Sequence, residues 1–163
     1  MSAIAYVALG ANLGDPIATV RAAITALQEM EASTLLASSS LYRTAPVGLK
    51  RQPDFINAVV RLATDLAPTD LLARLFALEA RFGRVRTIRN APRTLDLDLL
   101  LCDDLVIDLP GPPRLILPHP RMTERAFVLA PLAEIAPDLV IPGAGSINDL
   151  LPRVAEQRIE KLP

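Results

Sequence analysis

The stretch Leu95-Asp96-Leu97-Asp98-Leu99-Leu100-Leu101 decides the fold that we expect for this chain. Its alternating apolar and acidic residues are typical of a half-buried strand, because successive side chains of a strand point to opposite faces. The odd-numbered leucines, from Leu95 to Leu101, then face a core, and Asp96 and Asp98 share the other face about 7 Å apart. Two carboxylates so close together suit Mg²⁺, which takes one or two protein carboxylates and completes its shell with water and phosphate oxygens.

The alternative for the acidic pair is an ordinary solvated strand face. Aspartate is a poor strand former, however, so two of them in one strand call for a reason. The pair also follows an arginine-rich segment whose guanidinium groups could bind phosphate, namely Arg84, Arg86, Arg89 and Arg93. The pattern therefore favours a site for Mg²⁺ and phosphate.

The composition indicates a globular protein with a small anionic ligand. A chain of 163 residues predicts a single domain, residues 1–163, and 51% hydrophobic residues argue against disorder. The net charge of -1 and the 4% aromatic content argue against nucleic-acid binding, which favours a basic surface and stacking rings. Positive charge gathers instead over residues 81–93 and 114–125.

The single Cys102 has no partner for a disulfide or a zinc site, so a reducing compartment fits. By alternation it continues the face of the aspartates, and we predict a packed thiol rather than a nucleophile. The N-terminus lacks the basic region of a signal peptide, and no apolar run is long enough to span a membrane. We therefore expect a cytoplasmic protein that has no membrane partner.

The first half of the chain is expected to alternate strands and helices. Residues 3–9 are predicted as a buried strand, followed by a turn over 10–14. Asp15 is a typical N-cap and Pro16 suits the first helical position, so a helix is predicted to about Glu31. A strand ending over 38–44, a loop over 45–53 and a strand over 55–62, with Phe55 and Asn57 on one face, complete this half.

The second half contains two further predicted helices and a proline-rich stretch. A helix is expected from Pro68 to Gly83, and an irregular stretch over 110–120. A helix over 123–134, limited or kinked by Pro131, a short strand over 139–141 and a last helix over 146–151 follow. The interspersed elements predict an α+β layered sandwich, mainly an antiparallel sheet with helices packed on it, and a ferredoxin-like arrangement fits best.

Six motifs together resemble one enzyme family. They are Gly-Ala-Asn-Leu-Gly at 10–14, Ser-Ser-Leu-Tyr-Arg-Thr-Ala-Pro-Val-Gly at 39–48, Gln-Pro-Asp-Phe-Ile-Asn-Ala at 52–58, Gly-Arg-Val-Arg at 83–86, Pro-Arg-Thr-Leu-Asp-Leu-Asp at 92–98 and Leu-Pro-His-Pro-Arg-Met at 117–122. In this order they resemble the 6-hydroxymethyl-7,8-dihydropterin pyrophosphokinases of folate biosynthesis, from about residue 4 to 142. The resemblance implies transfer of the terminal diphosphate of ATP to the hydroxymethyl group of a pterin, with release of AMP, by a protein that we expect to be a monomer.

The resemblance also implies roles for the charged residues. Asp96 and Asp98 would hold two Mg²⁺ ions against the phosphates of ATP, and Asp98 would help to deprotonate the pterin hydroxyl. Arg86 and Arg93 would act in catalysis together with Asp98, because guanidinium groups meet the charge that develops on the leaving AMP. The implied ATP-binding set is Glu79, Arg84, Arg86, Arg93, Arg114, His119 and Arg125.

Two of these residues have ordinary alternatives. His119 is the only histidine of the chain, and a lone histidine is often structural, but the flanking prolines and nearby arginines favour a phosphate-facing ring. Glu79 could be a simple carboxylate on the surface of a helix.

The resemblance places the pterin between aromatic rings. Phe55 and Phe127 match the stacking positions, and Asn57 offers an amide to the polar rim of the heterocycle. Thr44 and Val47 match further positions that meet the pterin. The alternative is that both rings are simply core, but an Asn on the face of Phe55 argues against it, since a buried amide without a partner is costly.

Some positions depart from the family pattern. Asn90 stands where many members have Trp, and Ala45, Phe76 and Pro120 replace a common Pro, Gln and Tyr. A nucleotidyltransferase that releases pyrophosphate could carry the same acidic pair. Two rival classes are a non-catalytic ferredoxin-like binding module and an RNA-binding domain, and the charge balance disfavours the RNA-binding domain.

Overall fold

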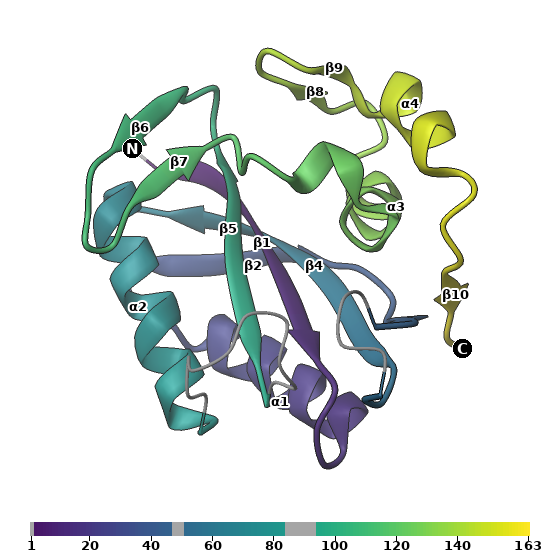
Figure 1. The fold of residues 1–163 in the computed structure, drawn as a ribbon. Coiled ribbons are helices and arrows are strands. Elements are labelled where there is room, and N and C mark those ends of the chain that lie inside the picture. Colours follow the sequence, from purple (N-terminus) through teal and green to yellow (C-terminus); the bar gives the residue numbers. More distant parts are fainter. Residues whose placement is uncertain (1, 47–50, 84–93) are drawn as a thin grey trace.

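The computed structural model describes residues 2–46, 51–83 and 94–163. Its centre is a six-stranded antiparallel sheet with the strand order β10-β3-β4-β1-β5, in which β2 also pairs with β4 (Figure 1). The strands are β1 (Ala3–Ala11), β2 (Ser33–Ser38), β3 (Tyr42–Thr44), β4 (Phe55–Thr64), β5 (Asp96–Cys102) and β10 (Glu160–Lys161). Together with the helices described next, this sheet confirms the predicted α+β class.

Helices cover both faces of the sheet. α1 (Pro16–Gln28) and α2 (Pro68–Arg81) lie on one face, and α3 (Ala126–Ile135) and the short α4 (Ile147–Leu150) lie on the other (Figure 1). Each face has its own hydrophobic cluster. The first cluster contains Val20, Leu75 and Leu97, and the second contains Val59, Leu129 and Leu132.

Strand β5 departs from the expected alternation after Leu99. Val7 of β1 pairs with Leu99 while Tyr6 pairs with Leu101, so Leu100 is an extra residue in β5. Such a bulge reverses the faces of the residues that follow it. Leu101 therefore joins the second cluster and Cys102 the first, and the predicted faces of both residues were wrong. Cys102 is fully buried, and this burial raises the pKa of its thiol.

The 110–120 stretch is more regular than expected. β6 (Ile107–Leu109) and β7 (Leu115–Leu117) form a hairpin, and the prolines at 110, 112 and 113 lie in its connection. Leu115 and Leu117 belong to the first hydrophobic cluster, which explains why this hairpin is held against the sheet. A second hairpin, β8 (Val140–Ile141) and β9 (Gly145–Ser146), precedes α4.

The helix ends differ from the predicted ones by a few residues. Asp15 caps α1 as expected, with its Oδ1 accepting a hydrogen bond from the Ala18 N–H at 3.1 Å, but the helix ends at Gln28 rather than Glu31. The predicted helix over 123–134 begins only at Ala126, because Met122–Glu124 form a separate 3₁₀ turn. The predicted strand over 38–44 is divided, since β2 ends at residue 38 and β3 begins at residue 42.

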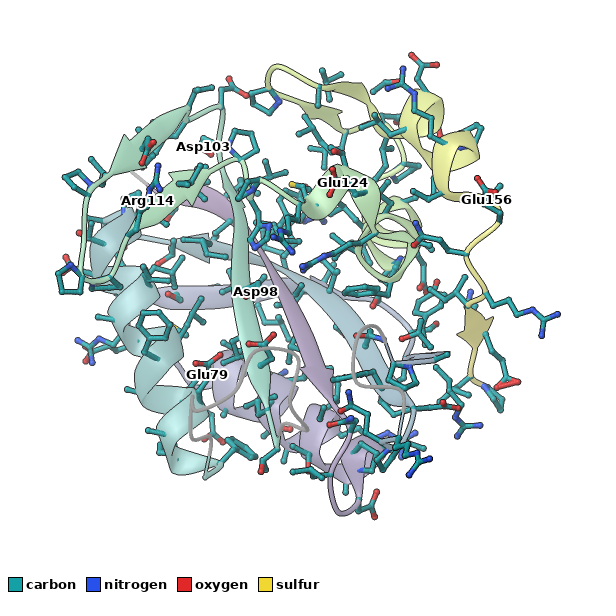
Figure 2. The ribbon with its side chains drawn as sticks, viewed as in Figure 1. Glu79, Asp98, Asp103, Arg114, Glu124 and Glu156 are labelled. Atoms are coloured by element: carbon teal, nitrogen blue, oxygen red, sulfur yellow. The ribbon has the colours of Figure 1, made fainter. Side chains whose placement is uncertain are left out.

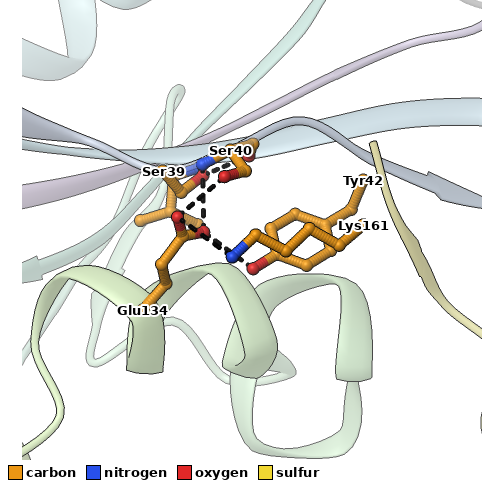
Figure 3. A network of polar contacts seen from close by, with 6 residues as sticks. Ser39, Ser40, Tyr42, Glu134 and Lys161 are labelled. Atoms are coloured by element: carbon orange, nitrogen blue, oxygen red, sulfur yellow. Dashed lines mark hydrogen bonds and ion pairs between the residues drawn. The ribbon is translucent and has the colours of Figure 1, made fainter. Parts of the chain in front are cut away.

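A polar network joins α3 to the edge of the sheet (Figure 3). The Glu134 carboxylate accepts hydrogen bonds from the Ser40 N–H at 3.0 Å, the Ser40 hydroxyl at 2.8 Å and the Tyr42 hydroxyl at 2.7 Å. Lys161 of β10 lies 3.7 Å from the same carboxylate. Burial opposes the charge of Glu134, but the hydrogen bonds from Tyr42 and Ser40 outweigh it and lower the pKa of this carboxyl.

Within the described ranges, no helix combines the length and the apolar character that a bilayer crossing requires.

The two long helices on the first cluster differ in their caps, which gives a stability prediction. Asp15→Ala should lower the free energy of unfolding by about 1 kcal/mol, because it removes the acceptor for an N-terminal N–H of α1. At the start of α2, Ala67 has extended backbone and no side-chain cap. Ala67→Ser should therefore raise the free energy of unfolding by up to about 1 kcal/mol. Urea unfolding followed by circular dichroism measures both, and changes of the same sign in the two variants would contradict this account.

Candidate active site

A cavity of about 550 Å³ opens over the part of the sheet that α3 leaves uncovered. Its floor is the end of the central strand β1, where Ala8 and Gly10 line it. Farther back along the same face of β1, Tyr6 belongs to the second hydrophobic cluster beneath α3, and Ala8 lies at the boundary between this cluster and the cavity. The cavity thus begins where the side chains of β1 become small.

Asn57 approaches the backbone of Gly10 closely. A Cβ at position 10 would lie 3.2 Å from the Asn57 Oδ1 atom, and Gly10 pairs directly with Asn57 across β1 and β4. The Asn57 Nδ2 donates a hydrogen bond of 2.9 Å to the Thr44 Oγ1 on β3. Asn57 and Thr44 are both buried and both line the cavity, so this bond holds the amide in one orientation.

Asp96 and Asp98 stand on the opposite side of the floor. They pair with Gly10 and Ala8 respectively, and both half-buried side chains line the cavity. Figure 2 shows the place of Asp98 on β5. The structure therefore confirms the prediction that the two aspartates share one face of β5.

The backbone between the two aspartates is held by Glu79 of α2. The Leu97 N–H donates a hydrogen bond of 2.7 Å to the Glu79 Oε2, and Glu79 is only 2% exposed. The alternative of a surface carboxylate is thus wrong for Glu79. Its predicted contact with ATP stays a prediction, and its observed contact fixes β5 at the acidic pair.

Two aromatic rings face the same cavity. Phe55 of β4 and Phe127 of α3 both line it and are half-buried. Phe127 packs against the edge of the second cluster, whereas Phe55 belongs to neither cluster. The Arg125 guanidinium lies 5.4 Å from the centroid of the Phe127 ring, a distance at which a cation is attracted to the ring face.

The loop before Phe55 is anchored to the motif at 10–14. Asn12 is 1% exposed, and its Nδ2 donates hydrogen bonds to the Gln52 Oε1 at 2.8 Å and to the Pro53 carbonyl at 3.1 Å. The motif residue Asn12 thus helps to hold the chain as it enters β4 at the cavity.

His119 lies beside the cavity in a defined tautomer. Its Nδ1 accepts a hydrogen bond of 3.1 Å from the Arg121 N–H, so the proton of the neutral ring is on Nε2. Burial, together with the positive charges of Arg125 and Arg121, lowers the pKa of His119 to about 4, although Asp96 opposes the shift. At neutral pH this histidine is therefore an uncharged hydrogen-bond donor.

Not all predicted residues come together in the described structure. Thr44, Phe55, Asn57, Asp96, Asp98, Arg125 and Phe127 line the cavity. Arg114 does not, because it lies on the β6–β7 hairpin and is paired there with Asp108 at 2.7 Å (Figure 2). Val47, Arg84, Arg86 and Arg93 lie outside the described residues, as does Asn90.

Among the described residues, four charged or polar side chains line the cavity although the sequence predicted no role for them. They are Arg121, Glu124, Gln157 and Arg158. Arg121 belongs to the basic cluster at 114–125, which was a signal for it. Gln157 and Arg158 lie in a C-terminal segment that carried no motif.

The donor set fits Mg²⁺ better than a metal held by protein ligands alone. Within the described ranges, no group of three or more His, Cys, Asp and Glu side chains could hold a metal ion. Two carboxylates on one strand, beside a cavity large enough for other oxygen ligands, match an ion that takes one or two protein carboxylates.

The shifted histidine gives a pH prediction. The unfolded chain protonates His119 near pH 6.5 and the folded chain only near pH 4, so stability should fall as pH falls through this window. This contribution is on the order of 2 kcal/mol and should be absent from His119→Asn. Urea unfolding near pH 7 and near pH 4.5 measures the free energy of unfolding of the wild type and of His119→Asn. An equal loss of stability in the two proteins would show that His119 does not cause the pH dependence.

Comparisons with known proteins agree on one family. Residues 6–137 match the model of 7,8-dihydro-6-hydroxymethylpterin-pyrophosphokinase (HPPK). A 2-amino-4-hydroxy-6-hydroxymethyldihydropteridine pyrophosphokinase from Pseudomonas aeruginosa is 48% identical over 158 residues, which are 97% of this chain and 96% of that protein. The enzyme of the same name from Haemophilus influenzae is 42% identical over 158 residues, 97% of each chain.

Solved structures show the same fold. The Plasmodium falciparum HPPK-DHPS wild type with pteroate superposes with a TM-score of 0.75 at 14% identity, over 94% of this chain and 42% of that one. This chain thus spans less than half of that longer protein, and at such low identity the likeness concerns the fold alone. From the family match and the relatives that are similar over nearly their whole length, this chain belongs to the 7,8-dihydro-6-hydroxymethylpterin-pyrophosphokinase family.

Proposed function

We propose that this chain transfers the terminal diphosphate of ATP to 6-hydroxymethyl-7,8-dihydropterin and releases AMP, as a step of folate biosynthesis. Membership of the family supports this activity, since its similar relatives carry the name of the pyrophosphokinase. One structural observation carries the proposal. One cavity is lined by the acidic pair of β5, Asp96 and Asp98, and also by the rings of Phe55 and Phe127 and the amide of Asn57.

The acidic side of the cavity is where we place the phosphates. Asp96 and Asp98 are the residues that would hold Mg²⁺, in our proposal two ions. When bound, these ions would screen the phosphate charge and steady the attacking and leaving oxygens. The backbone that carries the two carboxylates is held on both sides, by the pairing of β5 with β1 and by the hydrogen bond from the Leu97 N–H to Glu79.

The positive side chains complete the phosphate half. Arg125 lines the cavity, and burial keeps His119 neutral with its Nε2–H as a donor. In the transfer, the pterin hydroxyl gives up its proton, for which we propose Asp98 as the acceptor, and its oxygen bonds to the β-phosphorus while the bond from that phosphorus to the AMP oxygen breaks. Fixed donors stabilise the charge that moves to the leaving AMP. We propose this role for Arg125 and His119, and for Arg84, Arg86 and Arg93 of the segment outside the described residues.

The aromatic side of the cavity is where we place the pterin. A flat heterocycle stacks on Phe55 and Phe127, and each offset ring pair adds on the order of 1 kcal/mol beyond burial. Asn57 presents its amide at the rim, held in place by Thr44. In this proposal, the hydroxymethyl group of the bound pterin would point toward the acidic side.

We also propose that residues 1–163 form one domain with a ferredoxin-like core. In the sheet, β4 lies between the two strands of the unit β1-α1-β2, and β1 lies between the two strands of the unit β4-α2-β5. All pairs in the order β2-β4-β1-β5 are antiparallel. This interleaved arrangement supports the proposal.

The acidic pair gives the decisive test. Asp96→Asn and Asp98→Asn should each lower AMP formation from ATP, Mg²⁺ and the pterin by at least about 10²-fold, because each removes a charge from the metal site. Chromatography of the products measures AMP and the pterin diphosphate. The matched control is Asp104→Asn, an exposed carboxylate in the turn after β5, which should keep wild-type activity.

Two results would count against the proposal. Near-normal turnover in both variants would remove the aspartates from the reaction. Release of pyrophosphate instead of AMP by the wild-type protein would indicate a nucleotidyltransferase.

The cavity floor gives a graded test of the pterin half. Gly10→Ala and Gly10→Val should weaken pterin binding in that order, because the new Cβ lies 3.2 Å from the Asn57 Oδ1 and displaces the amide. We expect the valine variant to lose roughly tenfold or more in pterin affinity, a free-energy change typical of overpacking. Calorimetry with 6-hydroxymethylpterin measures this, and wild-type affinity in the valine variant would place the pterin elsewhere.

A further inference from the structure

The C-terminal segment contributes to the cavity wall. Gln157 and Arg158 line the cavity, although they lie beyond residues 6–137, the part of the chain that matches the family model. They follow the 3₁₀ turn Leu151–Val154 and precede β10. Figure 2 shows the neighbouring Glu156 at the start of this connection, on the side of the molecule where α3 lies.

Gln157 binds the backbone just before and at the start of α3. Its Oε1 accepts a hydrogen bond of 2.9 Å from the Ala126 N–H, and its Nε2 donates one of 2.8 Å to the Glu124 carbonyl. One amide group thus bridges both sides of Arg125 with a matched acceptor and donor.

This contact replaces a cap that α3 lacks. The first N–H groups of a helix have no partner within the helix, and the N-cap residue Arg125 makes no side-chain hydrogen bond to them. Gln157 therefore caps α3 from a distance of 31 residues in the sequence. Gln157 thereby holds the backbone of Arg125, which lies between Glu124 and Ala126, and that of Phe127, which follows Ala126.

Both held residues face the cavity. The Arg125 guanidinium lies 5.4 Å from the Phe127 ring centroid, and both side chains line the cavity, as Phe55 does. We propose that Gln157 is a positioning residue for the pterin half of the cavity, acting through the backbone that carries Arg125 and Phe127. This inference rests on the proposed function, because it takes the ligand of Phe127 to be the pterin.

The rest of the C-terminal segment is attached independently of Gln157. The pairing of β10 with β3, the hydrogen bond of 2.8 Å from the Leu162 N–H to the Leu41 carbonyl, and the Lys161–Glu134 contact all lie beyond it (Figure 3). Removing the amide of Gln157 should therefore loosen the start of α3 without detaching the segment.

The test separates the pterin half from the phosphate half. In Gln157→Ala, we expect the Kd of 6-hydroxymethylpterin to rise by roughly threefold to tenfold, because one part-buried and one exposed hydrogen bond are lost just before Phe127. The KM of ATP should rise by less, because Arg125 is only one of several groups that we assign to the phosphates, and Asp96 and Asp98 keep their places on β5. Glu156→Ala, an exposed neighbour outside the cavity lining, is the matched control and should bind the pterin like the wild type. Calorimetry gives the pterin Kd without turnover, and AMP formation gives the KM of ATP.

A second variant covers a failure of Gln157→Ala to fold. Gln157→Glu keeps the acceptor for the Ala126 N–H and loses the donor to the Glu124 carbonyl, so its pterin Kd should rise by less than that of the alanine variant. Wild-type pterin affinity in either folded variant would overturn the positioning role, and so would equal losses for pterin and ATP. Pterin binding by a wild-type protein that forms no AMP would instead overturn the proposed function alone.

Discussion

The pairing of β1 with both of its neighbours at Ala8 and Gly10 is the constraint on which the site depends. Small residues at the end of a central strand leave a hollow, and the register sets Asp96 and Asp98 on one side of it and Asn57 on the other. Larger side chains on β1 would fill this space, as Tyr6 does beneath α3. The chemistry of the cavity thus follows from the sheet register, which the backbone hydrogen bonds of three strands determine together.

The bulge at Leu100 marks the boundary between the cavity and the core. The acidic residues of β5 that precede the bulge face the cavity. Leu100 itself and the following Leu101 both join the cluster under α3. A regular strand would have placed Cys102 on that face instead. The extra residue therefore adds Leu101 to Leu100 on this face of the sheet, so the packed core beneath α3 begins directly beside the charged site.

Local patterns in the sequence predicted the parts of the site that depend on alternation and caps. The common face of Asp96 and Asp98, the common face of Phe55 and Asn57, and the Asp15 cap all follow from residues close together in the chain. The bulge was not predictable, because leucine occupies positions 99 to 101 and gives no contrast between faces. The burial of Glu79 against the Leu97 N–H and the contact of Gln157 with α3 were missed because they join distant segments.

The two halves of the cavity are held by different kinds of interaction. The acidic half is set by the pairing of the edge strand β5 with β1 and by the buried Glu79 carboxylate, so its geometry depends on the sheet and on α2. The aromatic half combines a strand residue, Phe55, with the start of α3, which side-chain contacts from a late segment of the chain hold in place. Changes in that segment can therefore adjust the aromatic wall while the carboxylates keep their positions. A cavity built in this way separates the requirements of phosphate chemistry from those of pterin recognition.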